Sequence, residues 1–81
     1  MSREKLDLNN QVKAHKAAIR LANELYGAGF ERVVVTFREK GECFIYVNKD
    51  GKELNVRHHY FTVQDNPQGI CYDLVEAMKE W

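Results

Sequence analysis

Hydrophobic residues recur at helical spacing near the start of the chain. Successive positions lie 4, 3, 4, 3 and 4 residues apart: Leu8, Val12, His15, Ile19, Ala22 and Tyr26. This spacing predicts an amphipathic helix that buries this stripe, broadened by Ala18 and Leu25, in the core. Asp7 or Asn9 is the expected N-cap. The glycines of "YGAGF" are the expected end, with Phe30 folded back over the last turn.

Alternating apolar and polar residues then predict two strands joined by a tight turn. In "ERVVVTFR" every second residue is apolar and faces inward: Val33, Val35 and Phe37. The turn "EKGE" follows, and a left-handed Gly41 would allow Arg38 to pair with Glu42. In that register three residues of the next strand share the inward face: Cys43, Ile45 and Val47.

The second hairpin, around "NKDG", allows two registers. With a two-residue turn at Asp50 and Gly51, or a four-residue turn over residues 48–51, four residues join the inward face: Leu54, Val56, His58 and Tyr60. With a bulged three-residue turn that begins at Lys49, Leu54 and Val56 would lie beside Phe44 and Tyr46 instead. The first register leaves no charged residue on the inward face, so we prefer it, although "NKDG" also suits the bulged turn.

A second helix is predicted to start at "QDNPQG". Asp65 or Asn66 can cap it, and Pro67 suits the first helical position. Its buried stripe is expected to hold Ile70, Cys71, Leu74, Ala77, Met78 and Trp81. The chain is therefore expected to form one α+β domain over residues 1–81 in the order α-β-β-β-α. We expect a three-stranded antiparallel meander with both helices packed on one face.

This order resembles the arrangement of elements in double-stranded-RNA-binding domains. The resemblance is one of architecture, and it implies phosphate contacts from a lysine-rich start of the last helix. The matching stretch here, "QDNPQGICYD", is acidic and lacks lysine. The sequence therefore gives no ground for assigning the chain to that family.

The outward face of the sheet is the candidate binding surface. It is expected to carry aromatic and cationic residues: Arg32, Arg38, Phe44, Tyr46, Arg57 and His59. Such a face can grip a protein, or stack the bases of single-stranded nucleic acid while cations hold the phosphates. It can also consist of cross-strand pairs that only stabilise the sheet. A secondary basic stripe, Lys13, Lys16 and Arg20, lies on the first helix.

Charge weighs against nucleic acid as the partner. The chain has 12 basic and 12 acidic residues, so it has no net positive charge to attract the phosphates of a nucleic acid. No segment has the length of a membrane helix, and the charged N-terminus does not match a signal peptide, so we expect a cytoplasmic protein with no membrane contact. We expect a protein partner, with RNA or another single-stranded nucleic acid, or a second copy of the chain, as alternatives.

No catalytic or cofactor motif occurs in the sequence. Cys43 and Cys71 are predicted to be free, buried thiols, which do not suit a nucleophile. His15, Cys43, His58 and Cys71 are the ligand types of tetrahedral zinc, yet their spacings are long for a structural site. We therefore expect no metal, no cofactor and no enzymatic activity, and interpret the chain as a small inhibitor, adaptor or accessory subunit.

Overall fold

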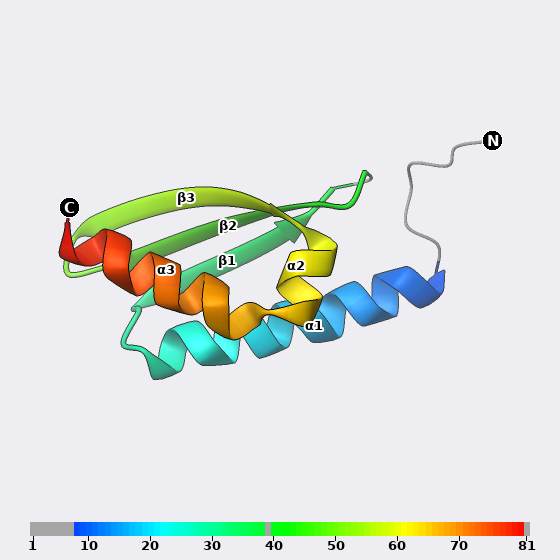
Figure 1. The fold of residues 1–81 in the computed structure, drawn as a ribbon, viewed down its shortest axis with the longest axis horizontal. Helices are drawn as coiled ribbons and strands as arrows, with labels where there is room; N and C mark the ends of the chain where they lie inside the picture. The colour runs from blue at the N-terminus through cyan, green and yellow to red at the C-terminus, as the bar shows by residue number, and fades with distance from the viewer. Residues whose placement is uncertain (1–7, 39, 81) are drawn as a thin grey trace.

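The chain forms a long helix, a three-stranded sheet and two shorter helices (Figure 1). The structure, a computed structural model, describes residues 8–38 and 40–80. Its elements are α1 (Leu8–Gly27), β1 (Arg32–Phe37), β2 (Glu42–Lys49), β3 (Lys52–His59), α2 (Tyr60–Asp65) and α3 (Pro67–Lys79). The strands pair antiparallel in the order β1-β2-β3, which confirms the predicted α+β meander.

The second hairpin adopts the two-residue turn. Asp50 and Gly51 both have positive φ, 55° and 80°, the combination that matches the twist of paired strands. Ile45 therefore lies opposite Val56, and Val47 lies opposite Leu54. The preferred register is confirmed, and the bulged alternative, with Leu54 and Val56 beside Phe44, is wrong.

The first hairpin closes as its sequence predicted. Gly41 has φ 82°, and the Arg38 N–H donates to the Glu42 carbonyl over 2.8 Å. A β-carbon at Gly41 would lie 2.9 Å from Nε2 of His59, so this turn also packs closely against the end of β3. Glycine is required here for its left-handed conformation and for this close approach.

The core lies between one face of the sheet and the helices. Fully buried side chains come from α1, β2 and α2: Leu21, Leu25, Cys43, Ile45, Val47 and Val63. On α3, Ile70, Cys71, Leu74 and Met78 complete the core, and Phe30 closes it at the end of α1. Both cysteines are free and buried, as expected. Ala77 is half-buried, and Trp81 lies outside the described residues.

The prediction for the buried stripe of α1 is confirmed at Leu25 and wrong at its exposed members. Val12, Ile19 and Tyr26 are 48%, 48% and 51% exposed, and His15 is exposed as well. The buried stripe instead consists of Ala14, Ala17, Leu21 and Leu25. Small side chains allow a helix to approach its neighbours closely, so the alanines face the core and the bulkier stripe faces outward. Ala18 and Ala22 lie half-buried between the two stripes.

The chain turns into a helix earlier than the sequence analysis expected. Tyr60, placed on a strand, begins α2 and is buried, with its ring 6.5 Å from that of Phe37. Asn66 interrupts the helical backbone and caps α3 by accepting from the Gly69 N–H, with Pro67 at the first position, as predicted. Asn9 lies within α1 and is not its N-cap, and Asp7 lies outside the described residues.

Candidate interface on the uncovered face of the sheet

All three helices lie on the same side of the sheet, and the described residues leave its other face uncovered (Figure 1). Alternation along the strands brings the outward residues onto this face. Val34 and Phe44 are its exposed large hydrophobic side chains, 47% and 37% accessible. The six residues predicted for a partner-binding site all come from this side of the strands or from their ends.

Phe44 on the central strand is the middle of the candidate interface. Thr36 lies opposite it on β1, and Arg57 lies opposite it on β3. The guanidinium carbon of Arg38 sits 5.3 Å from the centroid of the Phe44 ring, within cation–π range. Arg38, Lys40, Glu42 and Phe44 line a shallow hollow beside this contact. The site therefore combines an aromatic surface with a guanidinium group held in place over it.

Arg57 forms an ion pair on this face. Its Nη1 lies 3.5 Å from a carboxylate oxygen of Glu42, and both side chains are largely exposed. Glu42 is not among the site residues predicted from the sequence. Glu42 stands two residues before Phe44 on the same strand, so its alternation already placed it on the same face. This pair means that Arg57 is not an uncompensated cation.

Tyr46 and Arg32 lie farther along the sheet. Tyr46 is half-buried opposite Val34, and its hydroxyl accepts from the Asn48 side-chain amide over 3.4 Å. Arg32 pairs with Asn48, four residues along β2 from Phe44, which corresponds to about 13 Å. The structure thus brings together Arg38, Phe44 and Arg57, with Tyr46 adjacent and Arg32 apart.

His59 has a structural role at the edge of the site. Its Nδ1 accepts from the Phe61 N–H over 3.2 Å and so caps α2. Its ring stacks on that of Phe61 at 4.9 Å between centroids and 16° between planes. Phe61 is exposed and was not named as a site residue. One signal for α2 was available in the sequence: Tyr60, Val63, Pro67 and Ile70, all buried, follow one another at helical spacing.

The basic stripe lies on the helical side of the molecule. Lys13, Lys16 and Arg20 project from α1 and line a hollow that Gln64 and Asp65 of α2 close. Because α1 packs on the covered face of the sheet, this stripe and the Phe44 surface cannot contact the same short strand of nucleic acid. The side-chain oxygen of Gln64 is buried there without a hydrogen-bond partner among the described residues.

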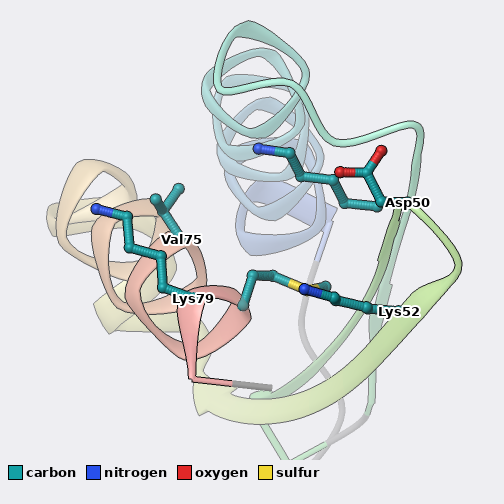
Figure 2. Close-up of a pocket in the computed structure, with 6 residues that line it drawn as sticks. Asp50, Lys52, Val75 and Lys79 are labelled. Carbon is teal, nitrogen blue, oxygen red and sulfur yellow. The ribbon is translucent and has the colours of Figure 1, made fainter.

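A further pocket lies where the β2–β3 turn meets α3. Figure 2 shows Asp50 and Lys52 of the hairpin on one side and Val75 and Lys79 of α3 on the other, and Lys49 and Met78 complete its lining. Lys49 donates to the Ala28 carbonyl over 3.4 Å, directly after α1 ends, and its Nζ lies 5.7 Å from the centroid of the Phe30 ring. Lys79 is in the last turn of α3, and its Nζ lies 3.1 Å from a carboxylate oxygen of Glu76.

These contacts give two of the three lysines in the pocket, Lys49 and Lys79, structural partners. The carboxyl end of a helix carries partial negative charge, which favours cations nearby. The ends of α1 and α3 lie at the same end of the molecule as this turn (Figure 1). Lys49 and Lys79 therefore neutralise helix ends, which accounts for two of the three lysines that line the pocket.

The chemistry of the thiols does not favour a cysteine nucleophile. Burial raises the pKa of Cys43 to about 12. Burial, and then the nearby Glu24 carboxylate, raise the pKa of Cys71, whose thiol donates to the Glu24 carbonyl over 3.5 Å. Both groups therefore keep their protons at neutral pH, whereas attack requires the thiolate.

The four residues considered for zinc do not converge. His58 lies opposite Cys43 on the sheet, but His15 is exposed on the outer side of α1. Across residues 8–38 and 40–80, no three His, Cys, Asp or Glu side chains are grouped closely enough to hold a metal ion.

Comparisons with protein families, curated proteins and solved structures found no match to this chain. Within the described part of the chain, no helix is long and apolar enough to span a membrane. The proposal for function therefore rests on the geometry of the site alone.

Proposed function

We propose that the domain is a small non-catalytic binding module, an inhibitor, adaptor or accessory subunit, that grips a protein partner with the uncovered face of its sheet. The observation that carries this proposal is the Phe44 ring, exposed at the middle of that face beneath the Arg38 guanidinium. Aromatic residues and arginine dominate the binding energy of protein interfaces, particularly near the centre of the contact. A partner that covers Phe44 would exclude water from this cation–π contact and strengthen it.

The charge of the face favours a protein over nucleic acid. The face carries four cations and two glutamates: Arg32, Arg38, Lys40 and Arg57, with Glu42 and Glu53. Arg57 already pairs with Glu42. Binding to phosphates requires an excess of cations, because affinity comes mainly from the release of counterions. A face that carries charges of both signs around an aromatic centre instead suits a partner that supplies apolar surface and charges of both signs.

The experiment is a capture from native lysate with a matched control. A photo-crosslinking residue is placed at Thr36, opposite Phe44, and in a second variant at Tyr72, a 64% exposed aromatic on α3. We expect a protein to crosslink through position 36 and not through position 72. With the identified partner purified, Phe44→Ala and Arg38→Ala should each weaken binding about tenfold or more, a change of about 1.4 kcal/mol, whereas Tyr72→Ala should not.

Two outcomes would refute this proposal. One is the absence of any partner at position 36 while the purified chain turns over a small molecule. The other is binding of a mixed-sequence RNA oligomer with a slope of about −2 to −3 in log affinity against log salt, as three or four phosphate contacts require. If Phe44→Ala and Tyr46→Ala abolished that RNA binding, the same face would be a nucleic-acid site instead.

A further inference from the structure

Helix α1 presents a second apolar surface, far from the uncovered face of the sheet. Val12, Ile19 and Tyr26 are each about half exposed, and His15 and Ala22 lie between them. We call these five residues the outer stripe of α1. It lies on the side of the helix turned away from the buried alanines and leucines. Exposed large apolar side chains in one contiguous row indicate a surface that another molecule covers.

The spacing of the outer stripe is that of helix-to-helix packing. Its members lie 3, 4, 3 and 4 residues apart, a repeat of seven residues. Two α-helices that pack along their length use this repeat, because it keeps one seam facing the partner. From Val12 to Tyr26 the stripe covers about 21 Å of helix, at about 1.5 Å per residue. A straight helix of similar length therefore fits this surface better than a globular loop or a single side chain.

The charged residues of α1 nearest the outer stripe are cations. At about 100° per residue, Lys16 lies about 40° round the helix from Val12, and Arg20 and Lys13 follow at about 80° and 100°. Within the described part of the chain, no ion pair or hydrogen bond engages these three cations. By contrast, Lys49 and Lys79 each have a partner. The outer stripe is thus bordered by a row of positive charge that no ion pair among the described residues engages, with Asp65 of α2 across the hollow on its far side.

We propose that the outer stripe of α1 binds an amphipathic helix of a partner protein, one whose apolar seam is flanked by aspartate or glutamate. Apolar residues of that helix would cover Val12, Ile19 and Tyr26, and its carboxylates would face Lys16, Arg20 and Lys13. Charge complementarity selects this occupant. In an antiparallel pair of two copies the same border of each helix would meet, which brings the cations of one copy to those of the other.

This surface is separate from the one proposed above. The uncovered face of the sheet and the outer stripe lie on opposite sides of the covered core, so one protein partner could occupy each. A domain with two such surfaces would act as an adaptor. The two proposals stand independently, because the variants that test one do not change the residues of the other.

Two synthetic peptides test the inference. Each has three heptads with leucine at the a and d positions, and the flanking e and g positions are all glutamate in one peptide and all lysine in the other. Each is fluorescently labelled and kept below the concentration at which it self-associates, and anisotropy is measured on addition of the full chain. We expect saturable binding of the glutamate peptide at least about tenfold tighter than that of the lysine peptide.

Matched variants locate the binding. Ile19→Ser should weaken binding of the glutamate peptide about tenfold or more, whereas Tyr72→Ser, at an exposed aromatic residue of α3 outside both proposed surfaces, should leave it unchanged. The triple change Lys13→Glu, Lys16→Glu and Arg20→Glu should reverse the preference towards the lysine peptide. All these positions are exposed, so the variants should fold.

Several results would overturn the inference. Equal binding of the two peptides, or binding of neither, would remove the acidic helix as the occupant. A wild-type dimer in sedimentation that Ile19→Ser disperses would identify a second copy of the chain as the occupant. Binding to vesicles of phosphatidylcholine and phosphatidylserine, lost in Ile19→Ser, would identify an anionic membrane surface instead.

Discussion

The two faces of the sheet are built from the same strands and differ in what lies against them. On the covered face, Cys43, Ile45 and Val47 of β2 are almost inaccessible to solvent. On the uncovered face, the intervening Phe44 remains exposed, and charged residues surround it. Neighbouring residues of one strand therefore experience opposite environments, because successive side chains point to opposite sides.

This difference shows where stability and binding are expected to separate. Burial of apolar area dominates the free energy of folding, so the covered face should carry most of it. A side chain that stays exposed contributes little to folding and keeps its apolar area available for a partner. If residues of both faces affected stability equally, the two faces would not differ in this way; the difference holds if stability and binding depend on different sets of residues.

The largest expected effect comes from truncation on the covered face. Ile45→Ala should lower the free energy of unfolding by about 2–5 kcal/mol, because it removes buried methyl groups and leaves a cavity beneath the helices. Tyr46→Ala, one residue further on, should lower it by less than about 1 kcal/mol and abolish partner binding. Urea unfolding of the two variants measures both values.

Arg57→Ala is the companion variant on the uncovered face. It also should change stability by less than about 1 kcal/mol and abolish partner binding, since its side chain is 65% exposed. If Tyr46→Ala unfolded the domain instead, its half-buried ring and its contact with Asn48 would be structural, and the site would have to exclude it.

A second effect of comparable size depends on pH and belongs to the covered face. The Cys43 thiol has a folded pKa of about 12 against an ordinary value of 9.0, so the folded state holds this proton more tightly than the unfolded state. The resulting stability is fully present below pH 9 and is lost as the pH rises towards 12. Each pKa unit corresponds to about 1.4 kcal/mol, which gives about 4 kcal/mol in all.

Cys43→Ala isolates this contribution. Lysines and tyrosines also titrate in the alkaline range, but they are the same in both proteins. Below pH 9 the difference in unfolding free energy between wild type and Cys43→Ala should be constant. Above pH 9 the wild type should lose stability relative to the variant, so the difference should decrease. A difference that stays constant to pH 12 would show that the thiolate is accommodated and that the covered face is less dry than its burial indicates.

The strands and their register were predictable from the sequence because one criterion, the absence of charged residues from the inward face of the sheet, distinguished the two registers. Only the register of a two-residue turn at Asp50 and Gly51, or of a four-residue turn over residues 48–51, kept charged residues off the inward face, and β2 and β3 pair in that register. The helix was harder, because α1 carries two apolar stripes. Spacing alone predicted burial of Val12, Ile19 and Tyr26. Spacing does not take into account that alanines allow the helix to pack closely against its neighbours, and the stripe with Ala14 and Ala17 is the buried one.

The candidate site was predictable in part for the same reason. Alternation placed Arg38, Phe44 and Arg57 on one face, where the structure brings them together. Contacts that depend on distance were not predictable, among them the ion pair of Glu42 and the capping of α2 by His59. The ion pair depends on the side-chain conformations of Arg57 and Glu42, which alternation does not give, and the cap arises at the end of β3, where the chain leaves the regular alternation.

The smallest expected effect concerns the ion pair on the uncovered face. A double-mutant cycle with Arg57→Gln and Glu42→Gln should give a coupling of about 0.2–1 kcal/mol, since both side chains are exposed and their nearest atoms are 3.5 Å apart. The coupling should decrease in 1 M salt, where screening acts over about 3 Å. Urea unfolding of the four proteins at low and high salt measures it.

The size of this coupling decides how Arg57 can act in binding. If it is weak, a partner's carboxylate can replace Glu42 at little cost, and Glu42→Gln should then leave binding unchanged or strengthen it. If the coupling exceeds about 2 kcal/mol and persists in salt, Arg57 is held by Glu42 as part of the fold, and a partner would have to bind the pair as a unit. In that case the uncovered face would be more rigid than the comparison of the two faces implies, and Phe44 with Arg38 would remain as the contact on which recognition depends.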